Sequence, residues 1–189
     1  FNAISVDGET STNDSFLAIN SGMKISNKYL PIIQEGINYV CQSLAKSIAR
    51  DGEGSNCLLE VLVTGFKRES EALKIAKSIV NSSLVKTAIH GCDPNWGRII
   101  AAAGNAGIDF NFDLLDLLIG DFQILNRGYL QEYEELMIVK YMQEKMNGKY
   151  LINDTIKITL NFNNGDAQAK AWGCDLSKKY IEINSEYTT

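Results

Sequence analysis

The clearest pattern in the sequence is a helical stripe of apolar residues followed by an apolar run of strand length. Pro31 suits the first turn of a helix, because its missing N–H is harmless there. Apolar side chains then recur at a spacing typical of a core-facing helix, at Ile33, Ile37, Val40, Cys41, Leu44 and Ile48. We expect this helix to end near Arg50, and Cys57 to Gly65 reads as a largely buried strand.

Helical and strand patterns continue to interleave along the rest of the chain. Helices are predicted over 69–83, 94–106, 132–146 and 177–183, and strands over 2–6, 15–20 and 84–90, with hairpins over 113–128 and 154–175. The second hairpin is predicted to turn at Asn163-Asn164-Gly165, a strong hairpin signal. The class is therefore α/β (α+β) with an antiparallel or mixed sheet. We expect residues 1–65 to form part of the core sheet layer, 66–150 an inserted smaller α/β unit, and 151–189 a return to the core sheet.

Charge and cysteine usage exclude several classes of function. The 18 Lys and Arg against 23 Asp and Glu give a net charge of −5, without a basic run, which argues against nucleic acid as a partner.

No uncharged stretch reaches the roughly 18 apolar residues of a membrane span. Four widely spaced cysteines and a single His argue against zinc fingers and His-rich metal sites, and favour reduced thiols in a cytoplasm-like compartment. The chain starts at Phe1 without signal-peptide features, so we expect the product of a cut or the ordered part of something longer.

Two polar segments could bind a ligand. The loop from Asp7 to Asp14, D-G-E-T-S-T-N-D, offers hydroxyl, amide and backbone donors, although its side chains could instead cap their own backbone as in an ordinary turn. Asp51-Gly52-Glu53-Gly54 follows the first helix, and the Glu53 carboxylate could hold a substrate ammonium by a charge-assisted hydrogen bond. Acids near a helix C-terminus are slightly unfavourable, so this position favours a functional role over a plain Gly-rich helix end.

The segment from His90 to Arg98, H-G-C-D-P-N-W-G-R, is the most distinctive in the sequence. His90 and Cys92 suggest a Cys-His dyad. Catalytic Cys and His are usually distant in sequence, so we favour a structural interpretation in which a strand ends, Asp93 caps a helix and Pro94 is its first residue.

Taken together, these segments resemble the ornithine acetyltransferase (glutamate N-acetyltransferase) family of arginine biosynthesis, and specifically its β chain. The matching motifs are D-G-E-T-S-T-N-D from Asp7, D-G-E-G from Asp51, D-P-N-W-G-R-I from Asp93, A-W-G-C-D-L from Ala171 and the ending I-N-S-E-Y-T-T. They occur in the family's order over the whole chain. The resemblance implies a layered αββα-type sandwich of the self-processing N-terminal-nucleophile kind.

The resemblance also implies a mechanism and its participants. Members cleave their own precursor before a Thr, whose hydroxyl takes acetyl from N-acetylornithine and passes it to glutamate by ping-pong catalysis. An oxyanion hole comes from the α chain. That Thr would lie upstream of Phe1, so no catalytic residue is assigned in this chain. The implied partners are the α chain in an α2β2 heterotetramer and the two small substrates; no cofactor is implied, apart from acetyl-CoA as an alternative acetyl donor.

Substrate-binding positions transfer by motif. Glu53 matches the family's substrate-contacting acid, and Asn184 and the terminal Thr189 match residues that close the pocket. Trp96-Gly97-Arg98 is expected to serve folding or subunit contact. Two alternatives stay open: an N-terminal-nucleophile amidase or aminopeptidase of related fold, and a non-catalytic ligand-binding or assembly subunit.

Overall fold

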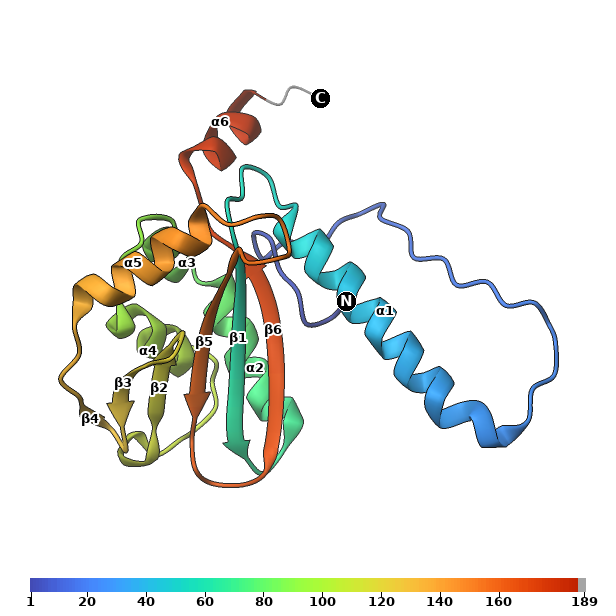
Figure 1. Cartoon of the computed structure of the whole chain (residues 1–189), viewed down its shortest axis with the longest axis horizontal. Coiled ribbons are helices and arrows are strands. Elements are labelled where there is room, and N and C mark those ends of the chain that lie inside the picture. The colour runs from blue at the N-terminus through green and yellow to red at the C-terminus, as the bar shows by residue number, and fades with distance from the viewer. Residues whose placement is uncertain (187–189) are drawn as a thin grey trace.

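The computed structural model describes residues 1–186 and contains one six-stranded mixed sheet with helices packed around it (Figure 1). The helices are α1 (Leu30–Arg50), α2 (Glu69–Asn81), α3 (Ser83–His90), α4 (Trp96–Gly104), α5 (Glu135–Met146) and α6 (Lys178–Glu186), with 3-10 turns at Asn27–Tyr29 and Phe112–Leu114. The strands are β1 (Leu58–Phe66), β2 (Asp116–Ile119), β3 (Phe122–Asn126), β4 (Tyr129–Leu130), β5 (Thr155–Asn161) and β6 (Ala167–Cys174). The expected α/β class is confirmed.

The sheet has the order β4-β3-β2-β5-β1-β6, so β1 lies between the two strands that follow it at the end of the chain. It pairs parallel with β5 and antiparallel with β6. The predicted hairpin over 154–175 is therefore wrong, because β5 and β6 do not pair with each other. The turn at Asn163-Asn164-Gly165 does exist, but it passes around the end of β1, where the Asn164 N–H donates to the Gly65 carbonyl at 2.8 Å.

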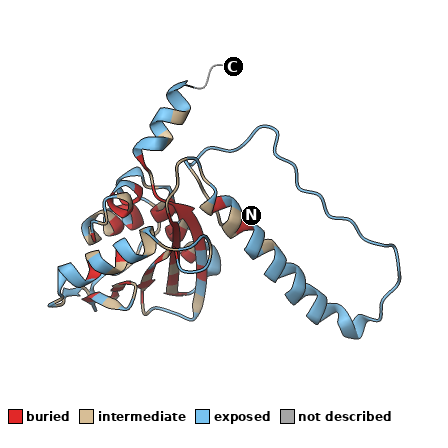
Figure 2. Cartoon of the chain, turned by 45° about the horizontal axis from the view of Figure 1, so that its top comes forward, coloured by how far each residue is buried: buried red, intermediate tan, exposed pale blue. Residues whose placement is uncertain are grey.

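One face of the sheet carries the main core. Leu59, Val61 and Val63 of β1 lie in register with Ile156, Ile158 and Leu160 of β5, and all six are buried. Alternate residues of a strand point to the same face, so these side chains form one apolar surface, which α2 covers with Ile75 and Ile79. Figure 2 shows the buried residues concentrated in this sheet and the helices around it.

The opposite face of β1 and β6 is more polar and is covered by the end of α1, with Ala3, Ile4 and Leu151 packed beside it. Ala49 of α1 packs there on Leu58 and Trp172 in a small second cluster. The Trp172 indole donates to the Glu60 carboxylate at 2.7 Å, and Lys46 and Lys170 lie 3.5 and 3.6 Å from the same carboxylate. Burial alone would raise the pKa of Glu60, but these partners outweigh it and hold the pKa below its ordinary value.

Three further local predictions are wrong. The segment 84–90 forms helix α3 rather than a strand, because Ser82 caps it by accepting from the Val85 N–H at 3.3 Å and its apolar residues meet the core at helical spacing. The segment 2–6 makes only a single bridge, between Ile4 and Trp172. The segment 15–20 forms no strand, since Phe16 and its apolar neighbours find no sheet edge and stay exposed.

The middle part of the chain joins the same sheet as the two ends, since β2, β3 and β4 continue it beyond β5. The boundaries of the three expected parts stay a prediction. Helix α1 projects away from the rest of the molecule, and only its C-terminal end is buried (Figures 1 and 2). Within residues 1–186, no helix is both long enough and apolar enough to cross a bilayer.

Candidate functional site

The D-G-E-G turn at the end of α1 and helix α6 bring two predicted site residues together. The side-chain amide of Asn184 donates to the Glu53 carboxylate, across 131 positions of sequence. Both border a cavity of about 370 Å³. The residues around the cavity are Val6, Asp7, Ile48, Asp51, Gly52, Glu53 and Asn184. A carboxylate and an amide at one open cavity form a site that can accept hydrogen bonds from an ammonium group and donate to a carbonyl or carboxylate.

Both glycines of the D-G-E-G turn are required by close packing. A Cβ on Gly52 would lie 2.7 Å from the Cys174 sulfur. Gly54 has a φ of +68°, and its Cβ would lie 2.8 Å from both the Ser177 hydroxyl and the Tyr180 nitrogen. The turn therefore sits directly against the end of β6 and the start of α6, which fixes Glu53 near Asn184.

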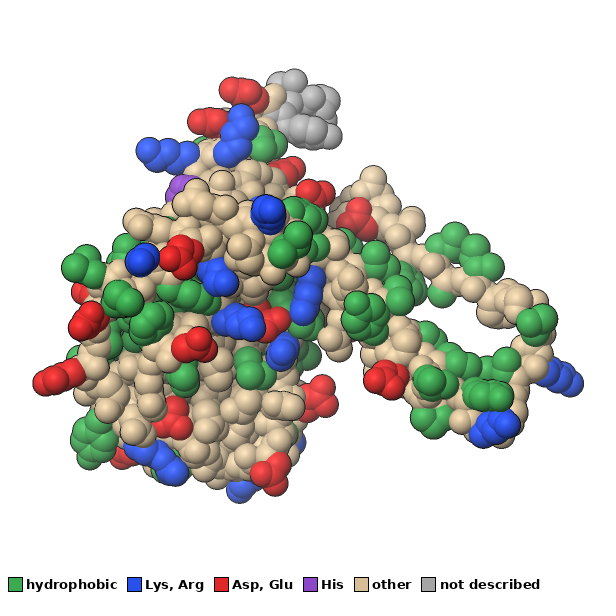
Figure 3. All heavy atoms as spheres, in the orientation of Figure 1, with side chains coloured by type: hydrophobic (Ala, Val, Ile, Leu, Met, Phe, Trp, Pro, Cys, Tyr) green, Lys and Arg blue, Asp and Glu red, His purple; other side chains and the backbone are tan. Residues whose placement is uncertain are grey.

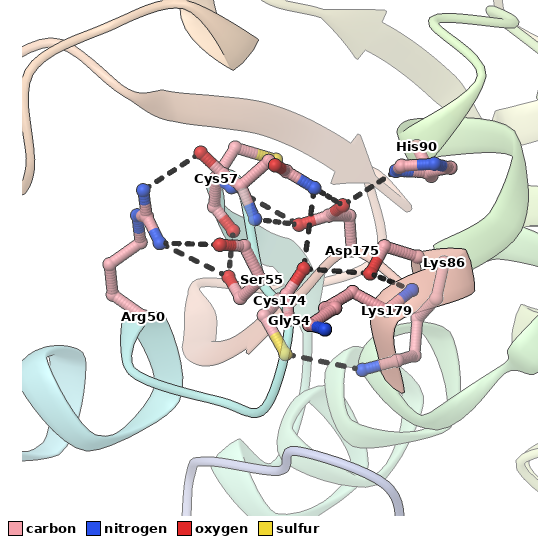
Figure 4. Close-up of polar contacts among 11 residues, drawn as sticks. Arg50, Gly54, Ser55, Cys57, Lys86, His90, Cys174, Asp175 and Lys179 are labelled. Carbon is pink, nitrogen blue, oxygen red and sulfur yellow. Dashed lines mark hydrogen bonds and ion pairs between the residues drawn. The ribbon is translucent and has the colours of Figure 1, made fainter. Parts of the chain in front are cut away.

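Asp175 is the central acceptor beneath the turn, and its side chain is fully buried (Figure 4). Its Oδ1 accepts from the backbone N–H groups of Asn56 at 2.7 Å and Cys57 at 3.1 Å. Its Oδ2 accepts from the Asn56 amide at 2.9 Å and lies 2.9 Å from Nδ1 of His90. Asp175 thus joins the chain after the D-G-E-G turn to the junction between β6 and α6.

Arg50 holds the other side of the same turn (Figure 4). Its guanidinium lies 2.5 Å from the buried Asp154 carboxylate and donates to the Ser55 and Asn56 carbonyls at 3.1 and 2.8 Å. These donors satisfy carbonyls just after the turn, while Asp154 also accepts from the Leu151 N–H at 3.0 Å. The sequence patterns did not single out Arg50, Asp154 or Asp175 as residues that support the site. Asp175 could have been recognised, because in A-W-G-C-D-L it is an acid that directly follows a predicted buried strand.

The loop that begins at Asp7 contributes its first residues to the site. The Tyr180 hydroxyl of α6 donates to Oδ2 of Asp7 at 3.0 Å, and the buried Lys86 ammonium donates to the Val6 carbonyl. Farther along, the Ser11 hydroxyl accepts from the Asp14 N–H, which is the local capping expected of an ordinary turn. The structural interpretation therefore holds for the exposed remainder of the loop, and ligand binding at its start stays a prediction.

The structure supports a structural role for the segment from His90 to Arg98, but the end of helix α3 rather than a strand precedes it, and Pro94 lies before the first residue of α4. His90 contacts Asp175, and burial raises the pKa of the Cys92 thiol, which keeps it protonated. The expected cap is corrected: Asn95 rather than Asp93 caps α4, accepting from the Arg98 N–H at 3.3 Å, because helix α4 begins at Trp96. The Arg98 guanidinium then donates to the Leu84 carbonyl at 3.0 Å and ties α4 to α3.

One predicted site residue, Thr189, lies outside the described residues 1–186. Of the three predicted site residues, the structure therefore describes Glu53 and Asn184. Their assignment as substrate contacts remains a prediction.

A family model described as "ArgJ family" matches residues 1–189. The chain belongs to the ArgJ family. The "Arginine biosynthesis bifunctional protein ArgJ" of Prochlorococcus marinus subsp. pastoris is 70% identical over 100% of this chain and 47% of its own length. The relative named "ArgJ 1" in Nostoc is 48% identical over 100% of this chain and 47% of its own length.

The fold agrees with a solved structure of the family. The crystal structure of the Bacillus halodurans protein named argJ superposes with a TM-score of 0.90 at 40% identity, covering 99% of this chain and 87% of that chain. The resemblance drawn from the five sequence motifs is thereby confirmed. The chain spans about half the length of the curated relatives it matches.

Proposed function

We propose that this chain is the β-chain portion of a glutamate N-acetyltransferase that moves acetyl from N-acetylornithine to glutamate in arginine biosynthesis. The observation that carries the proposal is the Glu53–Asn184 pair at an open cavity, in a chain of the ArgJ family. Glu53 would hold the substrate's free ammonium, the group that distinguishes an ornithine from a neutral amino acid. Asn184 would donate to an oxygen of the same substrate.

The acetyl group would be carried on the hydroxyl of a Thr upstream of Phe1, at the N-terminus of the β chain. The hydroxyl would attack the acetyl carbonyl, form an acyl-enzyme and release ornithine, and glutamate would then take the acetyl group. The α-amine of that Thr would serve as the base, so the mechanism makes no demand on His90, which contacts Asp175 instead. No cofactor enters this scheme, and acetyl-CoA would be an alternative acetyl donor in a bifunctional enzyme.

The partner would be the α chain of the same precursor, and the surface of α1 supports this. Its apolar stripe is about half exposed at Ile37, Val40, Leu44 and Ile48, and Figure 3 shows hydrophobic side chains gathered along this projecting arm. Exposed apolar stripes of this length mark protein contacts. Because Ile48 also borders the Glu53 cavity, a chain covering the stripe would reach the substrate site. We extend this proposal to an α2β2 assembly in the cytoplasm.

The experiment that tests the proposal compares the αβ enzyme with its Glu53→Gln variant. Loss of a charge-assisted contact to an ammonium is expected to raise the KM for N-acetylornithine by about 10- to 100-fold, with a much smaller change for glutamate. The matched control is Glu144→Gln on the exposed side of α5, which should leave both KM values unchanged. An unchanged KM in Glu53→Gln would remove Glu53 from the site. Rapid amide hydrolysis without an acceptor would favour the amidase alternative.

A further inference from the structure

Helix α6 carries Asn184 but has almost no apolar anchor. None of its residues 178–186 is buried, and Ile181 is 65% exposed. Figure 1 shows the helix standing above the end of the sheet. Helices in proteins are held mainly by packing an apolar face, so the position of α6 in this chain depends on polar contacts.

Three polar contacts join α6 and the residue before it to the site. The Ser177 hydroxyl donates to the Gly54 carbonyl at 2.7 Å and accepts from the Lys179 N–H at 3.1 Å, which fixes the start of the helix. One turn farther, the Tyr180 hydroxyl donates to Asp7 at 3.0 Å. The third contact is the Asn184 amide on the Glu53 carboxylate.

Tyr180 and Asn184 are four residues apart and therefore lie on the same face of α6. They are also joined directly, since the Asn184 amide donates to the Tyr180 backbone carbonyl at 3.0 Å. A displacement of Tyr180 would consequently displace the amide that contacts Glu53. The contact between Tyr180 and Asp7 thus controls Asn184 from one turn away.

The Asp7 carboxylate is arranged to receive the phenol. Its Oδ1 accepts from the Glu9 N–H at 3.0 Å, which orients the carboxylate within its own loop and leaves Oδ2 for Tyr180. Burial, followed by the hydrogen bond to Asp7, raises the pKa of Tyr180. The phenol therefore stays protonated at neutral pH and acts as the donor.

We propose that Tyr180 and Asp7 form a positioning pair that sets Asn184 against Glu53 and thereby determines the affinity of the site for the ornithine substrate. This inference rests on the proposed function. Glu53 can accept from an incoming ammonium and from Asn184 together, because a carboxylate has about four acceptor positions. The pair acts by keeping Asn184 in place while the ammonium binds, so it affects binding rather than the acetyl-transfer step.

The test uses the αβ enzyme and the Tyr180→Phe variant, which removes a single oxygen atom. We expect the KM for N-acetylornithine to rise about 3- to 10-fold, as for loss of one hydrogen bond, with kcat changed by less than about twofold. Loss of a ground-state contact has this signature. Tyr129→Phe, at an exposed tyrosine of β4, is the matched control and should change neither constant.

A double-mutant cycle separates this pair from independent contributions. Asp7→Ala should raise the same KM at least as much as Tyr180→Phe, and the double variant should be no worse than Asp7→Ala alone, because both changes remove one hydrogen bond. Asp7→Asn keeps an acceptor oxygen and should restore part of the affinity. If the KM increases of the two single variants multiplied in the double variant, Tyr180 and Asp7 would act independently, which would contradict the pairing.

Three outcomes are distinguished by the readouts. A fall in kcat with an unchanged KM would mean that Tyr180 only stabilises the fold, and an unchanged KM and kcat would likewise overturn the proposal. If the wild-type enzyme transfers no acetyl group, the proposed function fails, and the pair is then judged by calorimetric binding of ornithine. About 3- to 10-fold weaker binding of ornithine by Tyr180→Phe would support the positioning pair. Equal affinities of the variant and the wild type for ornithine would overturn it.

Discussion

Replacing Asp175 by Asn should destabilise the protein far more than removing its histidine partner. The substitution keeps the shape of the side chain but removes its charge. Hydrogen bonds to charged groups contribute about 1.5–3 kcal/mol, against about 0.5–1.5 kcal/mol for neutral ones. The two backbone donors of Asn56 and Cys57 would therefore lose about 1 kcal/mol each.

The new amide nitrogen adds a second penalty. It would stand where Oδ2 now accepts from the Asn56 amide, and a buried donor facing another donor costs about 1–3 kcal/mol. The expected total loss in the free energy of unfolding for Asp175→Asn is about 3–5 kcal/mol. His90 is more than a third exposed on its side chain, so water can replace it, and His90→Ala should cost less than about 1 kcal/mol.

The assay is urea denaturation of the purified protein and of both variants, followed by tryptophan fluorescence and compared at equal m-values. The expected order is a large loss for Asp175→Asn and a small one for His90→Ala. Equal losses in the two variants, or a loss below about 1 kcal/mol for Asp175→Asn, would show that Asp175 does not mainly hold the backbone after the D-G-E-G turn.

Two further predictions concern the turn and the sheet. Gly54→Ala should lower the free energy of unfolding by about 2–5 kcal/mol, because Gly54 has a positive φ and an added Cβ would overpack against Ser177. Thermal unfolding measures this loss, and an unchanged melting temperature would contradict the packing. Glu60 has a lowered pKa, so its charged form stabilises the fold above its ordinary value of 4.5, and this contribution is lost as the pH falls through the folded-state pKa. Glu60→Gln should therefore be less stable than the wild type near neutral pH, and its free energy of unfolding should fall less steeply as the pH is lowered. If the free energy of unfolding depended on pH identically in both proteins, Trp172 and the lysines would not stabilise the charged form of Glu60.

Local patterns predicted where α1 and β1 lie along the chain, but not which elements they pack against. The stripe after Pro31 predicted helix α1 correctly, but its apolar face stays about half exposed in this chain instead of facing the core, whereas the apolar run at Leu58 forms the buried strand β1. The segment at Ser83 was misassigned since short β-branched runs read alike in strands and buried helices, and the Ser82 cap decided between them. The pairing of β1 with both later strands depends on long-range packing, which no local pattern contains.

The sequence nominated two residues of the candidate site, but not the residues that support them. Motif resemblance predicts Glu53 as a substrate-contacting acid and Asn184 as a residue that closes the pocket, and the structure places the two in contact. Their role in substrate binding stays a prediction. The buried acceptors beneath them, Asp154 and Asp175, take donors from segments about a hundred residues away. A buried acid reads in sequence like any exposed acid, since only the fold reveals its donors.

The proposed function makes this chain part of an enzyme that would carry acetyl on its β chain between N-acetylornithine and glutamate. The most direct measurement is the intact mass of the β chain after the αβ protein is mixed with N-acetylornithine alone. We expect the mass of one acetyl group to be added, and to be lost on addition of glutamate with formation of N-acetylglutamate. A β chain that gains no acetyl group, or one whose acetyl group is released only to water when glutamate is present, would contradict the proposed acetyl transfer.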